Sequence, residues 1–510
     1  PVSEGELYAG SDDGLVHSTT DGGASWSRAQ ALPGVPARSF INDVEASLFD
    51  AGTVFAVADA HKVGDFSPYV FVSNDHGGSW RSIAGDLPEG TIAWAIQQDH
   101  VNRDLLFLGT EFGVYFSLNG GENWHKLAGA PTIAFRDIKL QRRDNDLVGA
   151  TFGRGFYILD DYSALRSMAQ TGFGEKPELF PVRDAWWYIP SVPMQAAGMP
   201  TLGSDSYVSA NPDFGAVFTY YLDEPFQTAR DQRHEVESKL RDQASDVPFP
   251  GWDRLTAESL EADPQVLILV SDEAGNPVRW LEAINERGTH RVSWDLRFPA
   301  VNPIDLSTPE FSPPWETDPQ GPLAAPGPYS AQLIAVTGEK VLPLGEAQPF
   351  NVKPVHEVLP GSDYAEIARY QQETSELLRD IMKTRAVLDQ KLELLGKMKA
   401  AAMAAPRAEP GLFQDLDRLG AELTRIKTRL SGDPVRQGLN ESTSPSIQGR
   451  AYNAASTWRT TQAATSTQRS DFEQAKRDFA SLSAGLDSLL NDELGRLQQE
   501  LVNAGAPGWL

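Results

Sequence analysis

Short apolar runs separated by polar, glycine-containing turns recur along the first 160 residues, a pattern that is typical of β-strands. Apolar runs such as 105–108 and 147–150 are each followed by a glycine-containing turn and a second apolar run, as in 113–117. A strand, a tight turn and a second strand make a β-hairpin. We therefore predict successive hairpins over residues 1–162.

The hairpins share an eight-residue segment that begins with Ser or Thr and ends with Trp. The pattern Ser/Thr-x-Asp-x-Gly-x-Ser-Trp is complete at 19–26 and 73–80, and the copy at 117–124 keeps its Ser, Gly and Trp. We expect the Asp or Asn to accept backbone N–H bonds in its own turn, the glycines to adopt positive φ, and the Trp to be buried between neighbouring units. These architectural residues are Asp21, Gly23, Trp26, Asp75, Gly77, Trp80, Asn119, Gly121 and Trp124.

The three copies stand about 40 to 55 residues apart, which is the spacing of β-propeller blades. This stretch makes three to four blades, whereas closed propellers need about four to eight. Exposed sheet edges would remain at both ends. We expect another chain, or an upstream segment cleaved from this one, to supply the remaining blades, because three to four blades cannot close a ring. The start at Pro1 is neither an initiator Met nor a signal peptide, so we expect the chain to begin after processing or to be a piece of something longer.

The eight-residue pattern resembles the Asp-box, or BNR, repeat of sialidases and of sortilin-type VPS10 propellers. As a whole, the chain resembles the C-terminal half of large bacterial sortilin-like proteins that are often labelled glycosyl hydrolases. The resemblance implies a ten-bladed propeller that binds peptides in its tunnel, with the Asp-boxes at the propeller edge and away from any site. It implies a fold and does not specify an activity.

The rest of the chain divides into a linker and two further domains. Residues 163–205 are the linker, in which Trp186 and Trp187 either pack against a neighbouring domain or form a sugar platform. Residues 206–356 carry short alternating strands and predict an immunoglobulin-like β-sandwich with a helical insertion at 227–243. Such a module follows the propeller in the bacterial proteins that the chain resembles.

From residue 362 the apolar period changes to 3.6. Asp363 and Glu366 form a capping-box-like helix start, and apolar stripes recur until residue 503. Four amphipathic helices with one longer crossover predict an antiparallel helical bundle over 362–503. The fold class is therefore multidomain and mainly β, with a partial propeller, an Ig-like sandwich and a helical C-terminus.

Composition limits the partners and the chemistry. The 70 acidic and 44 basic residues give a net charge of −26, which disfavours nucleic acid and anionic membranes and favours a cationic or protein partner. The chain contains no cysteine, so thiolate metal sites and disulfides are excluded. No apolar run reaches the roughly 20 residues of a membrane span.

No motif for catalysis, a cofactor or a metal stands out. The eight histidines lack metal-ligand spacing, and neither a nucleophile elbow nor a phosphate or dinucleotide loop occurs. Glu111, Asp144 and Asp160 could supply the two carboxylates of a glycosidase. Arg136 and Arg154 could point into a central channel and bind a ligand there. We therefore predict no catalytic, cofactor or metal residues.

The sequence supports a principal hypothesis and two alternatives. The principal one is a non-enzymatic scaffold outside the cytoplasm, periplasmic or secreted, whose sortilin-like propeller binds a protein or peptide. The first alternative is a sialidase-like glycoside hydrolase with its carboxylates on the propeller face. The second is an accessory subunit of a large envelope assembly, in which the acidic surface and the Pro-rich stretch 303–328 are interfaces.

Overall fold

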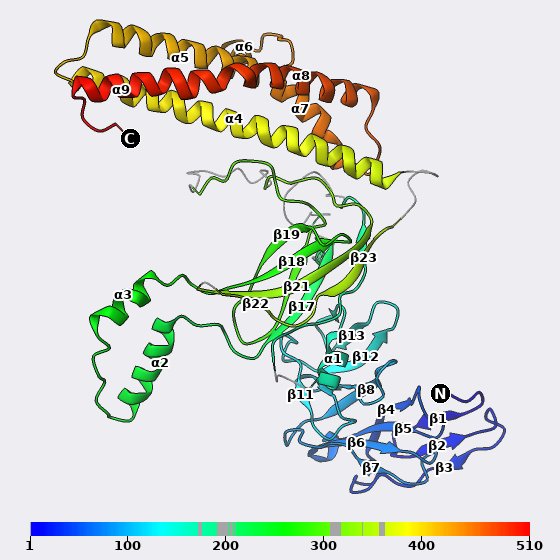
Figure 1. Ribbon diagram of the computed structural model, residues 1–510. Coiled ribbons are helices and arrows are strands. Elements are labelled where there is room, and N and C mark those ends of the chain that lie inside the picture. The colour runs from blue at the N-terminus through cyan, green and yellow to red at the C-terminus, as the bar shows by residue number, and fades with distance from the viewer. Residues whose placement is uncertain are drawn as a thin grey trace. The chain divides into compact units, whose positions relative to one another are not determined.

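The computed structural model shows mainly antiparallel sheets in the first two thirds of the chain and long helices in the last third (Figure 1). It describes residues 2–171, 176–190, 203, 208–209, 211–306, 318–338, 340–355 and 363–509. The chain forms two compact units, which are described separately. The first consists of Pro1–Pro181, Thr219–Pro225 and Asn285–His290, and the second of Val182–Phe218, Phe226–Ile284 and Arg291–Leu510.

The first unit begins with four successive antiparallel sheets, which we call blades 1 to 4. Each strand pairs with the next along the chain, so each blade is a simple meander. The strands are β1 (Leu7–Gly10), β2 (Val16–Thr19) and β3 (Ser27–Arg28) in blade 1; β4 (Phe40–Ala46), β5 (Val54–Ala60), β6 (Asp65–Ser73) and β7 (Arg81–Ser82) in blade 2; β8 (Ala93–Gln98), β9 (Leu106–Thr110), β10 (Gly113–Ser117) and β11 (His125–Lys126) in blade 3; and β12 (Phe135–Gln141), β13 (Asp146–Thr151) and β14 (Phe156–Leu159) in blade 4.

The blades stack face to face, with apolar side chains filling the space between neighbours. Phe55 and Val72 of blade 2 share a cluster with Ile96 and Leu108 of blade 3. The strands β4, β8 and β12 lie next to one another and form the inner edge of the stack. Such meanders, packed in sequence around inner strands, are consistent with part of a β-propeller, as the repeat predicts.

The chain leaves blade 4 through helix α1 (Ala164–Thr171), which a buried ion pair holds against blade 3. Asp99 is fully buried and accepts hydrogen bonds from Arg166 Nε at 2.7 Å and Nη2 at 2.6 Å, and from the Tyr162 hydroxyl at 2.8 Å. The backbone N–H of Asn102 donates to the same carboxylate at 2.7 Å. This network satisfies a charge that would otherwise destabilise the interior.

Two further sheets follow blade 4. One has the order β15 (Glu178–Leu179), β17 (Ala216–Leu222) and β20 (Gly288–Trp294). The other has the order β16 (Ala185–Trp187), β23 (Gln348–Pro354), β21 (Gly327–Thr337), β18 (Gln265–Asp272) and β19 (Pro277–Ala283), and β22 (Lys340–Pro343) pairs with β21. The immunoglobulin-like topology and the domain boundaries stay predictions.

Two features of the second unit bear on the predicted linker and insertion. Trp187 in β16 is buried and donates its indole N–H to the carbonyl oxygen of Ala324 at 2.9 Å, whereas Trp186 is 55% exposed. The segment between β17 and β18 forms two helices, α2 (Ala229–Asp242) and α3 (Trp252–Leu260). Part of the linker and of the Pro-rich stretch, with His356, lies outside the described residues.

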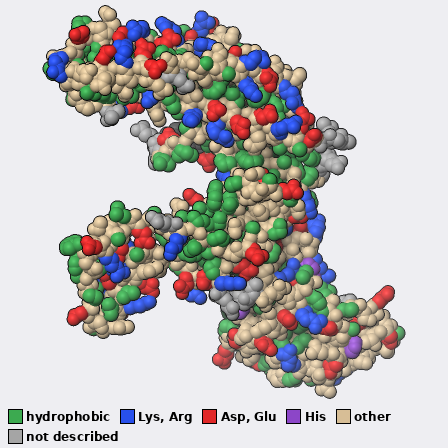
Figure 2. Space-filling view, viewed as in Figure 1, with side chains coloured by type: hydrophobic (Ala, Val, Ile, Leu, Met, Phe, Trp, Pro, Cys, Tyr) green, Lys and Arg blue, Asp and Glu red, His purple; other side chains and the backbone are tan. Residues whose placement is uncertain are grey.

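The C-terminal helices of the second unit, apart from the short helix at 434–438, contribute side chains to one apolar core. They are α4 (Tyr364–Ala404), α5 (Pro410–Ser431), α6 (Pro434–Gly438), α7 (Ile447–Ala455), α8 (Ser466–Ser488) and α9 (Leu494–Ala504). Leu388, Leu423 and Leu497 on α4, α5 and α9 are fully buried in this core. Acidic and basic side chains alternate over the visible surface of the helices (Figure 2). The helical C-terminus is thus confirmed.

Candidate functional site

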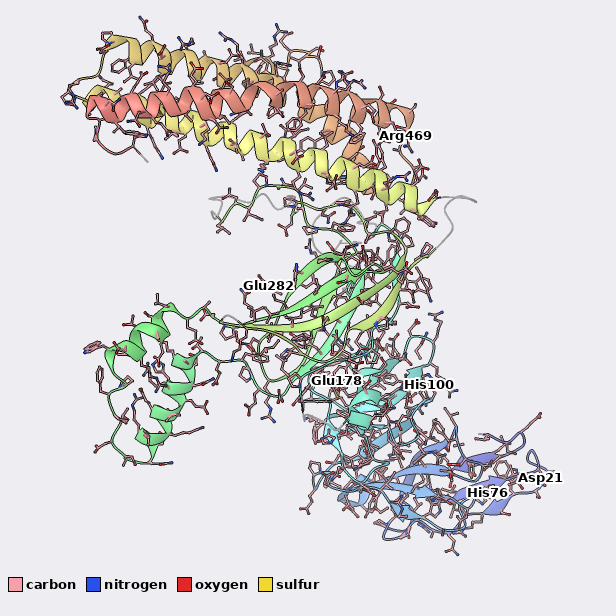
Figure 3. All side chains as sticks on the ribbon, viewed as in Figure 1. Asp21, His76, His100, Glu178, Glu282 and Arg469 are labelled. Carbon is pink, nitrogen blue, oxygen red and sulfur yellow. The ribbon has the colours of Figure 1, made fainter. Side chains whose placement is uncertain are left out.

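The three octet segments (19–26, 73–80 and 117–124, called octet turns below) connect the last two strands of blades 1, 2 and 3. In each turn the third residue accepts a hydrogen bond from the backbone N–H four residues later: Asp21 from Ser25 at 2.9 Å, Asp75 from Ser79 at 2.7 Å, and Asn119 from Asn123 at 3.0 Å. Hydrogen bonds from the Ser25 hydroxyl, the Ser25 backbone N–H and the Thr19 hydroxyl lower the pKa of the Asp21 carboxyl to about 2. Figure 3 shows Asp21 and His76 in the turns of neighbouring blades. The third residue thus locks its own turn, whereas other polar groups of the turns bond to residues outside them, as Asn123 Nδ2 does to Asp86 at 3.2 Å.

The octet tryptophan of one blade packs onto the preceding blade. Trp124 lies among Val70, Ile83 and Leu87 of blade 2, and Trp80 lies beside Val16 of blade 1. Trp80 and Trp124 are 9% and 6% exposed, whereas Trp26 of blade 1 is 47% exposed. The octet residues thus lie in turns and between blades, where burial of a large ring stabilises stacking.

Each inner strand carries a β-bulge near its first residue, and the three bulged residues occupy equivalent positions. Strand register shifts between Ile41 and Asp43, between Ala93 and Ala95, and between Phe135 and Asp137. The extra residues are therefore Asn42, Trp94 and Arg136. Bulges re-aim side chains and are frequent beside binding sites.

Arg136 and Trp94 form the centre of a candidate ligand site, which we call the rim cluster together with Glu111, His61 and Phe152. The Arg136 guanidinium carbon lies 3.4 Å from the Trp94 ring centroid and 5.3 Å from that of Phe152. The Trp94 indole N–H donates to Glu111 Oε2 at 2.9 Å, and Arg136 Nη2 lies 3.8 Å from the same oxygen. The His61 ring meets Trp94 edge-on with centroids 5.7 Å apart.

The rim cluster combines fixed and accessible groups. Trp94 is 6% exposed, whereas the Arg136 side chain is 40% exposed and Phe152 is 70% exposed. Asp59 is buried and binds the His61 ring nitrogen, which fixes that ring. A guanidinium held over an indole can donate hydrogen bonds to a carboxylate from solution while the aliphatic part of the arginine side chain stays in place.

Arg154, the second arginine suggested by the sequence, does not join the rim cluster. It lies in an exposed turn between Gly153 and Gly155, which have φ of 88° and 74°. Within the described residues its side chain has no hydrogen bond, ion pair or ring contact in the structure. Its role in ligand binding stays a prediction.

The three candidate acids are not brought together. Glu111 lies in the β9–β10 turn, beside Arg136 at the start of β12. Asp144 lies beyond the other end of β12, where it pairs with Arg143 at 2.7 Å. At about 3.3 Å per strand residue the two acids are roughly 15 to 20 Å apart, beyond the roughly 5 to 10 Å of glycosidase pairs. Asp160 follows β14, at the same end as Asp144.

A second polar row follows the inner strands. Asp43 Oδ2 accepts the backbone N–H of Ile96 at 2.9 Å, and Glu45 Oε2 accepts the Gln97 side-chain N–H at 3.0 Å. Burial raises the pKa of both carboxyls, and the neighbouring Asp43 charge raises that of Glu45 further. These bonds join blade 2 to the unpaired edge of β8, so we interpret the row as structural.

Sequence reasoning named Arg136 and Glu111 but missed Trp94, His61 and Asp59. A signal exists for Trp94, since residues 92–96 are an apolar run of Ile and Ala in which a single indole stands out. Among the described residues no group of three or more His, Asp or Glu side chains could hold a metal ion. Nor does any described helix have the length and apolarity to cross a membrane.

Comparisons with known proteins give a likeness of structure alone. No protein-family model and no curated protein matches the chain. Solved structures that are similar to it include YCF48 bound to D1 peptide (16% identity, TM-score 0.25, 35% of this chain and 55% of that one). Another is the GH74 xyloglucanase from Xanthomonas campestris, with 12% identity, a TM-score of 0.27, and coverage of 43% of this chain and 34% of that one. A third is PorZ of the Porphyromonas gingivalis type-IX secretion system, with 12% identity, a TM-score of 0.22, and coverage of 69% of this chain and 50% of that one.

The matched region spans between about a third and about half of those three proteins. At these identities and TM-scores the likeness carries no argument about activity, substrate or partner. The site must therefore be interpreted from its own residues.

Proposed function

We propose that this protein is a non-enzymatic binding scaffold that acts outside the cytoplasm, in the periplasm or after secretion. Its sortilin-like, Asp-box propeller, completed by blades from another chain or from a cleaved upstream segment, binds a protein or peptide. An Ig-like sandwich and a helical bundle complete the scaffold. The observation that carries the proposal is Arg136, held over Trp94 at an accessible end of the inner strands.

The chemistry of the rim cluster suits a peptide that carries a carboxylate and an aromatic ring. Arg136 offers guanidinium donors, and Phe152 offers an exposed ring beside it. Glu111 lies close enough to orient Arg136 without closing a tight ion pair, because the two are 3.8 Å apart. This geometry contains no activated nucleophile and favours binding over turnover.

The faces of blades 1 and 4 support completion by other blades. Trp26 is 47% exposed where Trp80 and Trp124 are buried against a preceding blade. On blade 4, Phe156 and Ile158 are 76% and 59% exposed. Apolar faces of this kind are buried at each interface between blades 1 to 4, so these two faces are suited to the same packing.

A peptide selection tests the proposal. A random peptide library is selected on the full chain, and the enriched peptides are measured on Arg136→Met. As a matched control, Arg103→Met removes an exposed arginine that pairs with Asp50 at 2.8 Å. We expect enriched peptides to bind Arg136→Met about 5 to 30 times more weakly, and Arg103→Met as tightly as the wild type.

Two outcomes would contradict the proposal. One is a selection that yields no binders, or binders that Arg136→Met retains in full. The other is hydrolysis of a glycan by the full chain together with its completing blades, abolished by Glu111→Gln, which would favour the hydrolase alternative. The scaffold requires no turnover.

A further inference from the structure

A cavity of about 240 Å³ lies between blades 3 and 4. Val114, Leu127 and Pro131 line it from blade 3, and Phe135 and Tyr157 line it from blade 4. The lining is mostly apolar, and the cavity lies beside β14, which is the edge strand of blade 4. An apolar cavity at a sheet edge can receive a side chain from an added strand.

The cavity occupies the position that the octet tryptophan fills at the other blade interfaces. The carbonyl oxygens of Val70 and Val114 accept the backbone N–H groups of Ile83 and Leu127 at 2.9 and 2.8 Å, so these two pairs are equivalent. Val70 and Ile83 share their cluster with Trp124 of the following blade. Val114 and Leu127 line the cavity, where the structure places no tryptophan among the described residues.

A comparison of two glycines supports the equivalence. Gly85 and Gly129 both come two residues after these positions and both have positive φ, of 51° and 82°. A Cβ on Gly85 would collide with the carbonyl oxygen of Glu122 in the next octet turn. A Cβ on Gly129 would meet no described atom within 4 Å. The space that an octet turn fills beside Gly85 is therefore open beside Gly129.

Blade 4 lacks this turn because its third strand continues differently. By strand register Leu159 stands where Ser73 and Ser117 begin the octet turns of blades 2 and 3. The hydroxyl of Ser117 accepts the N–H of Gly121 at 2.8 Å, and leucine cannot replace it. The chain turns into α1 instead, so β14 has no outer strand among the described residues.

We propose that this cavity receives the tryptophan of another polypeptide, whose segment carries an octet-like turn and adds to β14 as the outer strand of blade 4. This inference rests on the proposed completion of the propeller and names the chemistry of the completing segment. In blades 1, 2 and 3 the residue after the tryptophan pairs with the strand that precedes the octet turn, as Arg81 does with Val72. The corresponding residue of the partner would pair with Ile158.

A second copy of this chain cannot supply the segment from its folded blades. Trp80 and Trp124 are buried against the preceding blades of their own chain. Trp26 is exposed, but the strand that follows it, Ser27–Arg28, already pairs with β2. The contact that the partner would make with blade 3 is of the same kind as the contacts already present between blades 1 and 2 and between blades 2 and 3.

The test uses the full chain and a labelled synthetic peptide with the sequence of residues 117–127, which contains the third octet and its outer strand. Binding is followed by fluorescence anisotropy. A control peptide carries Trp124→Ala, and we expect it to bind roughly 30 times more weakly or worse. In the protein, Ala130→Trp fills the cavity and should abolish binding, whereas Met403→Trp, at an 82% exposed helix position, should not.

Equal binding of both peptides, unchanged binding by Ala130→Trp, or no binding at millimolar peptide would overturn the proposal. Self-association that Ala130→Trp abolishes would assign the cavity to a second copy and would also overturn it. If Ala130→Trp fails to fold, the two peptides on the wild-type chain still decide. If the octet peptide fails this test but library-selected peptides still depend on Arg136, the proposed function stands and the cavity assignment falls. If only the dependence of library-selected peptides on Arg136 fails, the cavity assignment stands.

Discussion

The indole N–H of Trp124 donates a 2.9 Å hydrogen bond to the carbonyl oxygen of Ile83 in the preceding blade. The backbone N–H of Trp124 donates to Asp86 of the same blade at 2.7 Å. One residue of an octet turn therefore joins two blades through its ring and its main chain. The first two of the five predictions below concern this contact.

Trp124→Ala should lower the free energy of unfolding of the first unit by about 3 to 5 kcal/mol, because it removes a ring that is 6% exposed between two blades. Trp26→Ala is the matched control in an equivalent turn. With 47% of its surface exposed, it should cost less than about 1 kcal/mol. Hydrogen exchange of peptides from residues 54–124 measures the difference, and equal costs would contradict the stacking role.

Trp124→Phe should cost about 1 kcal/mol more than Trp80→Phe. Phenylalanine keeps most of the ring but leaves the Ile83 carbonyl oxygen without its donor. The Trp80 indole N–H is buried and has no hydrogen-bond partner within the described residues, so its removal loses no bond. Thermal unfolding of the two variants compares them, and a larger loss for Trp80→Phe would refute the argument.

Arg166→Ala should destabilise the first unit by about 3 to 5 kcal/mol, because it leaves the fully buried Asp99 carboxylate without its cation. The control is Arg103→Ala, whose pair with Asp50 is about half exposed and should contribute about 0 to 1 kcal/mol. Urea unfolding of the first unit, followed by circular dichroism, is the measurement. Similar losses in both variants would show that α1 is not anchored through Arg166.

The pH dependence of Asp99 has a definite sign. Burial by itself would raise the pKa of Asp99, but the bonds from Arg166, Asn102 and Tyr162 outweigh it and hold the pKa below the ordinary value. Its contribution to stability is therefore present above the unfolded pKa and is lost as pH falls through the folded pKa. Asp99→Asn should be much less stable than the wild type at pH 7, and the gap should narrow below about pH 4.

Glu45→Gln should have the opposite dependence. Burial and then Asp43 raise the pKa of Glu45, so its contribution to stability is full below the unfolded pKa and is lost as pH rises through the folded pKa. The amide can still accept the hydrogen bond from Gln97. We expect the variant to melt at a higher temperature than the wild type at pH 7 and at a similar temperature near pH 4. A lower melting temperature at pH 7 would show that the Glu45 charge stabilises the row.

Several features could be predicted from the sequence because they are local. The spacing of Trp26, Trp80 and Trp124 indicates repeated hairpins, and a mainly β fold consistent with part of a propeller is what the structure shows. The 3.6-residue period after residue 362 predicts the helical C-terminus in the same way. Turn chemistry and apolar period act within a few residues, so they can be seen without the fold.

Only the tertiary structure brings Trp94, Glu111 and Arg136 together. Their contact depends on how blades 3 and 4 are placed against each other and on the bulges in β8 and β12. The tertiary structure also decides that the position equivalent to an octet tryptophan is a cavity beside β14. The substitution of Leu159 for the octet serine is visible in the sequence. That it leaves a space for a ring, however, follows from the packing of one blade on the next, which no local pattern encodes.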